Sequence, residues 1–151
     1  MTIETKIQIE VLKRLEKEKS LSWYAKDEKW VYITTNGYYG IRISKYKFFL
    51  NCAFMKPMQA MVSHFSSDQL IESYELTITD EIRNIGAGTG VILRCKKFDT
   101  CIRSKILKKI FKKKCKLYSK DNKSSIYFVL NGEIYAVVMP VYISKKESGL
   151  C

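Results

Sequence analysis

Hydrophobic residues near the start of the chain recur at a helical spacing. Ile7, Val11 and Leu15 lie four residues apart with Leu12 beside them, and the other face carries Lys13, Arg14, Glu16, Lys17 and Glu18. Side chains at this spacing share one face of an α-helix. The pattern therefore predicts an amphipathic helix over about 5–19, with its apolar face turned toward a core.

Beyond this segment, short apolar or alternating runs predict strands, and two Asn-Gly pairs predict tight turns. The pairs at 36–37 and 131–132 suit type I′ hairpins, because both central residues of that turn need a positive φ. We expect strands at 29–35, 38–44, 73–79, 91–95, 116–119, 125–130 and 133–143. The run 47–51 is expected to add to the sheet, residues 52–68 to form a short helix or a packed loop, and residues 80–90 to form a loop.

A second amphipathic helix is predicted from about Thr100 to Lys114, with Asp99 or Thr100 as its N-terminal cap. Its apolar stripe would consist of Ile102, Ile106, Leu107, Ile110 and Phe111. Its opposite face would carry Lys105, Lys108, Lys109, Lys112 and Lys113. An apolar stripe below a polar face is typical of a helix that packs on a sheet and presents charge to solvent.

The two halves of the chain align without a gap at an offset of 95 residues. Residues 3–43 lie over residues 98–138, so that both predicted helices, the strands after them and both Asn-Gly turns coincide. The identical positions in the first half are Thr5, Ile7, Leu12, Lys13, Lys17, Lys19, Tyr32, Asn36 and Gly37. Agreement of stripe, strand and turn at one offset favours an internal duplication over two unrelated helix-plus-hairpin units.

The repeated unit is one helix followed by three strands. We expect a single α+β domain over 1–144, with units at about 3–50 and 91–143 and a frayed tail at 145–151. Two amphipathic helices would cover one face of an antiparallel sheet. This arrangement resembles one domain of the DNA sliding clamps (processivity factors), which are built from paired units of this kind with helices that line the DNA hole. The chain departs from that family in holding one such domain where a ring needs several, and in having only one strongly basic helix.

Length and composition narrow the class of protein. The chain has 151 residues, of which 46% are hydrophobic and 28% charged. This suits one globular domain and excludes a collagen-like or disordered chain. No apolar run approaches the roughly 20 residues that cross a bilayer, and the first residues lack the apolar core of a secretion signal. We therefore expect a cytoplasmic protein with no membrane partner.

Positive charge is concentrated in one segment. The chain carries 27 Lys+Arg against 15 Asp+Glu, a formal net charge of +12. Residues 94–123 are rich in lysine and hold only two acidic residues, Asp99 and Asp121, so the rest of the chain is nearly neutral. A lysine-rich surface attracts phosphate backbones with affinity but little base specificity. The residues expected to bind nucleic acid or an acidic partner are Arg103, Lys105, Lys108, Lys109, Lys112, Lys113, Lys114 and Lys116.

Aromatic residues on the predicted strands define a second candidate surface. Alternation within 29–35 separates Val31 and Ile33, which are expected to face the helices, from the aromatic positions on the other side of the sheet. The residues expected there are Trp30, Tyr32, Tyr38 and Tyr127. Two interpretations stay open: these residues form an exposed protein interface, or residues 52–68 cover them.

No set of residues indicates catalysis, a metal ion or a cofactor. His64 is the only histidine, and the serines and aspartate beside it in sequence seldom converge into a triad. The five cysteines lack paired metal-ligand spacing and are expected to be reduced, partly buried thiols. The glycine-rich run 86–90 leads into a strand rather than a helix, so it predicts an inter-strand connection. A hydrolase that uses a cysteine or His64 is the least favoured class.

Two functions follow from these features. The favoured one is a small non-enzymatic basic protein that binds nucleic acid or a nucleoprotein complex through the lysine-rich helix, with a nuclease or a replication protein as a candidate partner. The alternative is a phage-encoded inhibitor of a host nucleic-acid-guided defence nuclease (an anti-CRISPR type) that acts by protein–protein contact. Direct binding would weaken with salt and with charge reversal of the helix lysines, whereas an inhibitor would depend on Trp30 or Tyr32.

Overall fold

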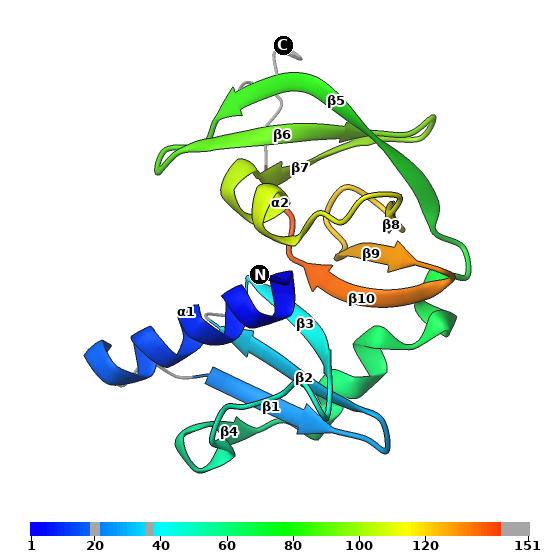
Figure 1. Ribbon diagram of the computed structural model, residues 1–151. Helices are drawn as coiled ribbons and strands as arrows, with labels where there is room; N and C mark the ends of the chain where they lie inside the picture. Colours follow the sequence, from blue (N-terminus) through cyan, green and yellow to red (C-terminus); the bar gives the residue numbers. More distant parts are fainter. Residues whose placement is uncertain (19–21, 36–37, 143–151) are drawn as a thin grey trace.

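The computed structural model describes residues 1–18, 22–35 and 38–142 (Figure 1). The predicted turn at Asn36-Gly37, the predicted helix end at Lys19 and the predicted tail at 145–151 lie outside the described residues, as does Cys151.

Helices and strands follow the predicted order over most of the chain. The helices are α1 (Ile3–Glu18), α2 (Ser104–Ile110) and the short 3-10 helices η1 (Cys52–Phe54), η2 (Gln59–Phe65) and η3 (Ser67–Leu70). The strands are β1 (Ser22–Lys26), β2 (Trp30–Thr35), β3 (Tyr39–Ser44), β4 (Lys56–Pro57), β5 (Tyr74–Asn84), β6 (Thr89–Arg94), β7 (Asp99–Arg103), β8 (Lys116–Ser119), β9 (Ile126–Leu130) and β10 (Glu133–Val138). The first predicted helix is confirmed as α1, and residues 52–68 form packed 3-10 turns.

The described strands form one 10-stranded sheet in the order β4-β1-β2-β3-β10-β9-β8-β5-β6-β7. Neighbouring strands are antiparallel, apart from the short parallel pair of β1 and β4. The sheet curves, so that β5, β6 and β7 arch over α2 while α1 crosses the strands β1 to β3 (Figure 1). The α+β class is confirmed.

Two three-stranded meanders meet at the centre of this sheet. Strands β1, β2 and β3 form one, and β8, β9 and β10 form the other. They join edge to edge through β3 and β10, where Ala136 pairs with Ile41. The turn between β9 and β10 has the predicted hairpin geometry, because Asn131 and Gly132 both have positive φ, 53° and 78°.

The main core lies between the two α-helices and the concave face of the sheet. Ile7 and Val11 of α1 and Ile106 and Ile110 of α2 are buried in one apolar cluster with side chains from β2, β3, β6, β9 and β10. Both helices therefore cover the same face, as expected. Val31 and Ile33 belong to this cluster, which confirms their predicted orientation toward the helices.

A smaller core lies on the opposite face of the sheet. Tyr32 and Tyr127 are buried there beneath Met61 and Phe65 of η2. The rings of Tyr32 and Phe65 lie 4.8 Å apart between centroids, and the Tyr127 hydroxyl lies 3.2 Å from Gln69 Oε1. Residues 52–68 therefore cover two of the four predicted aromatic side chains, Tyr32 and Tyr127, whereas Trp30 is only partly buried and Tyr38 is half exposed.

The predicted second helix is wrong at both ends. Residues Asp99–Arg103 form β7 and pair with β6, and α2 covers only Ser104–Ile110. Neither Asp99 nor Thr100 caps the helix; Arg103 stands at the N-cap position and makes no side-chain capping bond. The prediction failed because apolar residues four apart fit both a helix and alternate positions of a strand, so Ile102 matched both patterns.

Three strand predictions also need correction. The run 47–51 is not a strand, because the backbone of Lys47 and Phe49 bonds to the buried side chain of Gln8: Gln8 Nε2 donates to Lys47 O (3.2 Å) and Phe49 N donates to Gln8 Oε1 (2.8 Å). Strand β5 continues through 80–84, leaving only 85–88 as the connection to β6. Strand β10 stops at Val138, and Val141 N then donates to Cys101 O (2.8 Å) at the outer edge of β7.

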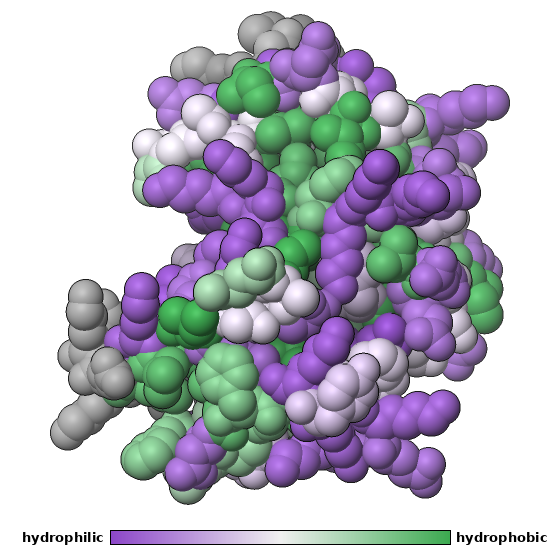
Figure 2. Space-filling model, in the orientation of Figure 1, coloured by the Kyte–Doolittle hydropathy of each residue, from purple (hydrophilic) through white to green (hydrophobic). Residues whose placement is uncertain are grey.

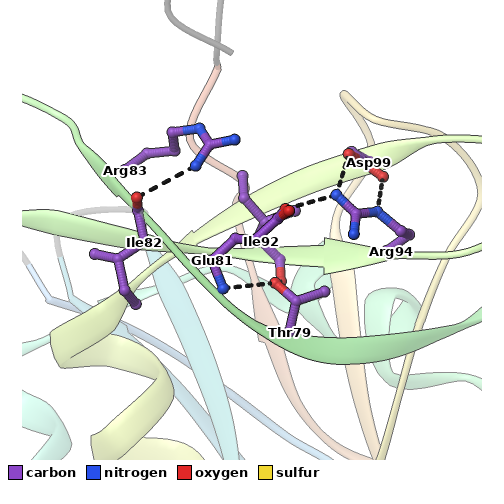
Figure 3. Close-up of polar contacts among 7 residues, drawn as sticks. All are labelled: Thr79, Glu81, Ile82, Arg83, Ile92, Arg94 and Asp99. Atoms are coloured by element: carbon purple, nitrogen blue, oxygen red, sulfur yellow. Dashed lines mark hydrogen bonds and ion pairs between the residues drawn. The ribbon is translucent and has the colours of Figure 1, made fainter. Parts of the chain in front are cut away.

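Strand β5 bends where its pairing with β6 becomes irregular, between Ile78 and Ile82. Thr79 Oγ1 donates to Ile92 O (2.7 Å) and accepts from Glu81 N (3.1 Å), so one side chain bonds both strands at the bend (Figure 3). Arg94 on β6 pairs with Glu81 (2.6 Å) and Asp99 (2.9 Å). Bulges of this kind increase local twist, which explains how the sheet curls over α2.

Candidate nucleic-acid interface

Helix α2 divides its side chains between the core and solvent. Ile106 and Ile110 are buried, whereas Lys105 and Lys108, three residues apart, are exposed on the opposite side. These two lysines have no acidic partner among the described residues. Short as it is, α2 therefore presents two free ammonium groups to solvent.

Two other predicted site residues point to α1 instead. Lys109 Nζ lies 2.7 Å from Glu10 Oε2, and Lys112 Nζ forms an ion pair with Glu4. Each ammonium group also lies over a tyrosine ring, 5.4 Å from the centroid of Tyr39 for Lys109 and 4.6 Å from that of Tyr135 for Lys112. The structure thus places Lys109 and Lys112 in a seam between the helices, with their charges compensated.

The electrostatics of Glu4 reflect this seam. Burial acts to raise the pKa of its carboxyl, but the hydrogen bond from Lys112 and the positive charges of Lys112 and Lys47 outweigh it. The pKa of Glu4 therefore lies below its ordinary value of 4.5, and the carboxylate is held in its charged form.

The turn after α2 adds more positive charge to the exposed side. Lys113 and Lys114 are exposed, and Lys114 has a φ of 70°, within a turn that Cys115 N closes on Lys112 O (3.0 Å). Lys116 begins β8 and lies 3.7 Å from Glu75, with both side chains largely in solvent. We call Lys105, Lys108, Lys113 and Lys114 the open lysine surface.

Arg103 occupies a different position. Its guanidinium, at the end of β7, lies 5.1 Å from the ring centre of Tyr38, the residue before β3. The structure thus brings together one residue predicted for the basic face and one predicted for the aromatic face. Among the predicted aromatic residues, Tyr38 is half exposed, and Trp30 is partly covered by Arg42, whose guanidinium lies 3.7 Å from its ring centre.

Sequence reasoning missed two partners of the lysines and misplaced one apolar residue. Glu10 pairs with Lys109 and Glu4 pairs with Lys112, which leaves the other lysines of this region without these partners. The one sequence signal for these pairs is that both glutamates lie on the first predicted helix, which shares a sheet face with the basic helix. Phe111, predicted in the buried stripe, is 42% exposed because α2 has already ended.

His64 and the cysteines are the remaining candidates for chemistry. His64 is exposed on η2. Among the described residues, no three His, Cys, Asp or Glu side chains form a group able to hold a metal ion. Cys52, Cys95, Cys101 and Cys115 are free thiols, and burial raises the pKa of Cys101 to about 11. Among the described helices, none is long and apolar enough to cross a membrane.

Comparisons with protein-family models, curated proteins and solved structures return no match. Function is therefore inferred from the residues and their geometry.

Proposed function

We propose that this protein binds nucleic acid without sequence specificity, through the open lysine surface of α2 and the turn after it. The observation that carries the proposal is the separation of the lysines into compensated and free groups. Lys109 and Lys112 are paired with α1, whereas Lys105, Lys108, Lys113 and Lys114 are exposed and have no acidic partner among the described residues.

Lysine ammonium groups suit phosphate oxygens because they are compact, mobile point charges with several donors. Binding would release counterions from the nucleic acid, so affinity would fall steeply with salt. Base recognition generally needs side chains that reach base edges with a defined donor and acceptor pattern. A surface built of lysines alone therefore favours affinity over sequence readout, and Lys116, loosely paired with Glu75, would add to it.

The order of helices and strands supports the resemblance to one domain of the sliding clamps. The two meanders meet through β3 and β10, each preceded by an α-helix on the same face of the sheet. Strands β8, β9 and β10 lie close to the positions that the 95-residue offset gives from β1, β2 and β3. We propose that the chain arose by internal duplication and acts as a single clamp-like, non-enzymatic module.

The burial of two aromatic residues disfavours the alternative function, an inhibitor that acts through aromatic contacts. It relied on Trp30, Tyr32, Tyr38 and Tyr127 as an exposed surface. Tyr32 and Tyr127 are buried beneath η2, so at most two of the four side chains can contact a partner without rearrangement.

The test is a fluorescence anisotropy titration with labelled DNA and RNA across a salt series. We expect the variant with Lys105, Lys108, Lys113 and Lys114 changed to Glu to lose binding. The matched control changes the exposed Lys13, Lys29, Lys45 and Lys56 to Glu, with the same total charge. Equal loss of binding in both variants would show that net charge, and not this surface, determines affinity. Absence of binding by the wild-type protein at low salt would overturn the proposal.

A further inference from the structure

An apolar strip lies beside the open lysine surface, on the concave side of β5. Ile78 pairs with Leu93 and Ile82 with Val91 across the β5–β6 ladder. Directly paired residues of antiparallel strands point to the same face, and Leu93 and Val91 belong to the main core. Ile78 and Ile82 therefore face the side occupied by α2, yet they are 39% and 53% exposed.

One flank of α2 faces this strand pair. Ser104 Oγ lies 2.8 Å from Thr89 Oγ1 at the start of β6. Leu107 and Phe111 follow Ser104 at helical spacings of three and seven, so they lie on the same flank, away from the α1 seam. Phe111 N still donates to Leu107 O (2.9 Å), which keeps Phe111 in line with the helix.

We call Ile78, Ile82, Leu107 and Phe111 the apolar strip; Leu107 is partly buried against the main core, and the other three are exposed. Figure 2 shows hydrophobic side chains gathered over β5, β6 and α2, with hydrophilic side chains on both sides. Figure 3 shows Ile82 and Arg83 on opposite sides of β5. Arg94 follows the core residue Leu93 on β6, so it points to the face away from the strip. Lys108, three residues before Phe111, borders the strip on its solvent side.

We propose that the nucleic acid bound here is single-stranded, with its phosphates on the open lysine surface and its unpaired bases packed against the apolar strip around Phe111. This inference rests on the proposed function and assigns it a substrate class. Unpaired bases expose apolar faces, and an aromatic ring beside a basic surface offers them a stacking platform of any sequence. Duplex bases are already stacked, so a duplex would reach the lysines but leave the strip uncovered.

The experiment compares a labelled single strand of about 15 nucleotides, within the range of known single-strand sites, with its duplex. We expect the single strand to bind at least about tenfold more tightly at one salt concentration. Phe111→Ala should weaken single-strand binding about fivefold or more and leave duplex binding unchanged. Ile82→Asn provides a second variant of the strip, and Ile71→Ala, at an exposed isoleucine outside the strip, is the matched control. Thermal melting confirms that each variant is folded.

The outcomes separate the two proposals. If the wild-type protein binds neither the single strand nor the duplex, the proposed function itself is overturned. Equal affinity for single strand and duplex, with no effect of Phe111→Ala or Ile82→Asn, would overturn the single-strand assignment and leave the lysine surface intact. Binding of neither nucleic acid, together with binding of an acidic apolar peptide that Phe111→Ala abolishes, would assign the strip to a protein partner instead.

Discussion

Lysines on the two sides of α2 differ in what surrounds them. On the side that faces α1, Lys109 and Lys112 pair with Glu10 and Glu4 and lie over tyrosine rings. On the solvent side, Lys105 and Lys108 have no acidic partner among the described residues. Helix α2 and the turn after it therefore use the same residue type both to contact α1 and to carry an exposed positive charge.

The difference shows why a count of charges along the chain overstates the field of a surface. The basic segment is neutralised at several points by carboxylates from distant parts of the chain: Glu4 and Glu10 on α1, Glu75 and Glu81 on β5. The free charge that remains is smaller but confined to one surface. Mutations that exchange seam and open positions should separate stability from binding.

The largest expected effect comes from charge reversal in the seam. Lys112→Glu would remove the ion pair with Glu4 and place two carboxylates together at a partly buried site. We expect a loss of about 2 kcal/mol or more in the free energy of unfolding, measured by urea denaturation. Lys113→Glu, one residue on but exposed, should change it by less than about 0.5 kcal/mol. Equal losses would contradict the division into seam and open surface.

The next effect concerns the tyrosine beneath the seam. The buried Tyr135 hydroxyl donates to Ile110 O (2.9 Å) and so anchors the last residue of α2 to β10. Tyr135→Phe should cost about 1 kcal/mol of unfolding free energy, because a buried carbonyl loses its donor. Tyr38→Phe serves as the control, since Tyr38 is half exposed and its change should be nearly neutral in thermal melts.

Two neighbouring lysines should have opposite roles: Lys109 should affect stability, and Lys108 should affect nucleic-acid binding. Lys109→Ala removes the contacts with Glu10 and Tyr39 and should cost about 0.5–1 kcal/mol of stability. Lys108→Ala should leave the melting temperature unchanged but reduce the salt dependence of nucleic-acid binding by about one phosphate contact. Titrations of both variants against one oligonucleotide would show this, and a greater loss of binding in Lys109→Ala would reverse the assignment.

The smallest effect is a pH dependence of the seam. Because the folded-state pKa of Glu4 lies below 4.5, its charged form stabilises the fold above that value, and this contribution disappears as pH falls through the lowered pKa. Glu4→Gln should therefore be less stable than the wild type at pH 7, and the difference should shrink in acid. Unfolding curves from pH 7 to pH 2 measure it; a constant difference would show that the carboxylate charge contributes nothing.

The local hydrophobic pattern was sufficient to assign the orientation of an element whose two faces have different surroundings. The alternation Val31-Tyr32-Ile33 assigned the two faces of β2, and the spacing of Ile7 and Val11 assigned the buried face of α1. It failed at Ile102, where a spacing of four fits both a helix and a strand. It also failed at 47–51, because a buried glutamine from α1 takes the backbone bonds that a neighbouring strand would have made.

The candidate site divides in the same way. The sequence alone determined that lysine is concentrated near α2 and that Ile106 and Ile110 face the core. Only the tertiary structure decided which lysines are free, that η2 buries Tyr32 and Tyr127, and that Phe111 and Ile82 stay exposed. The sequence could not give these partners for a physical reason. Periodicity reports how a side chain is oriented on its own element, whereas its partners come from segments that folding brings together from elsewhere in the chain.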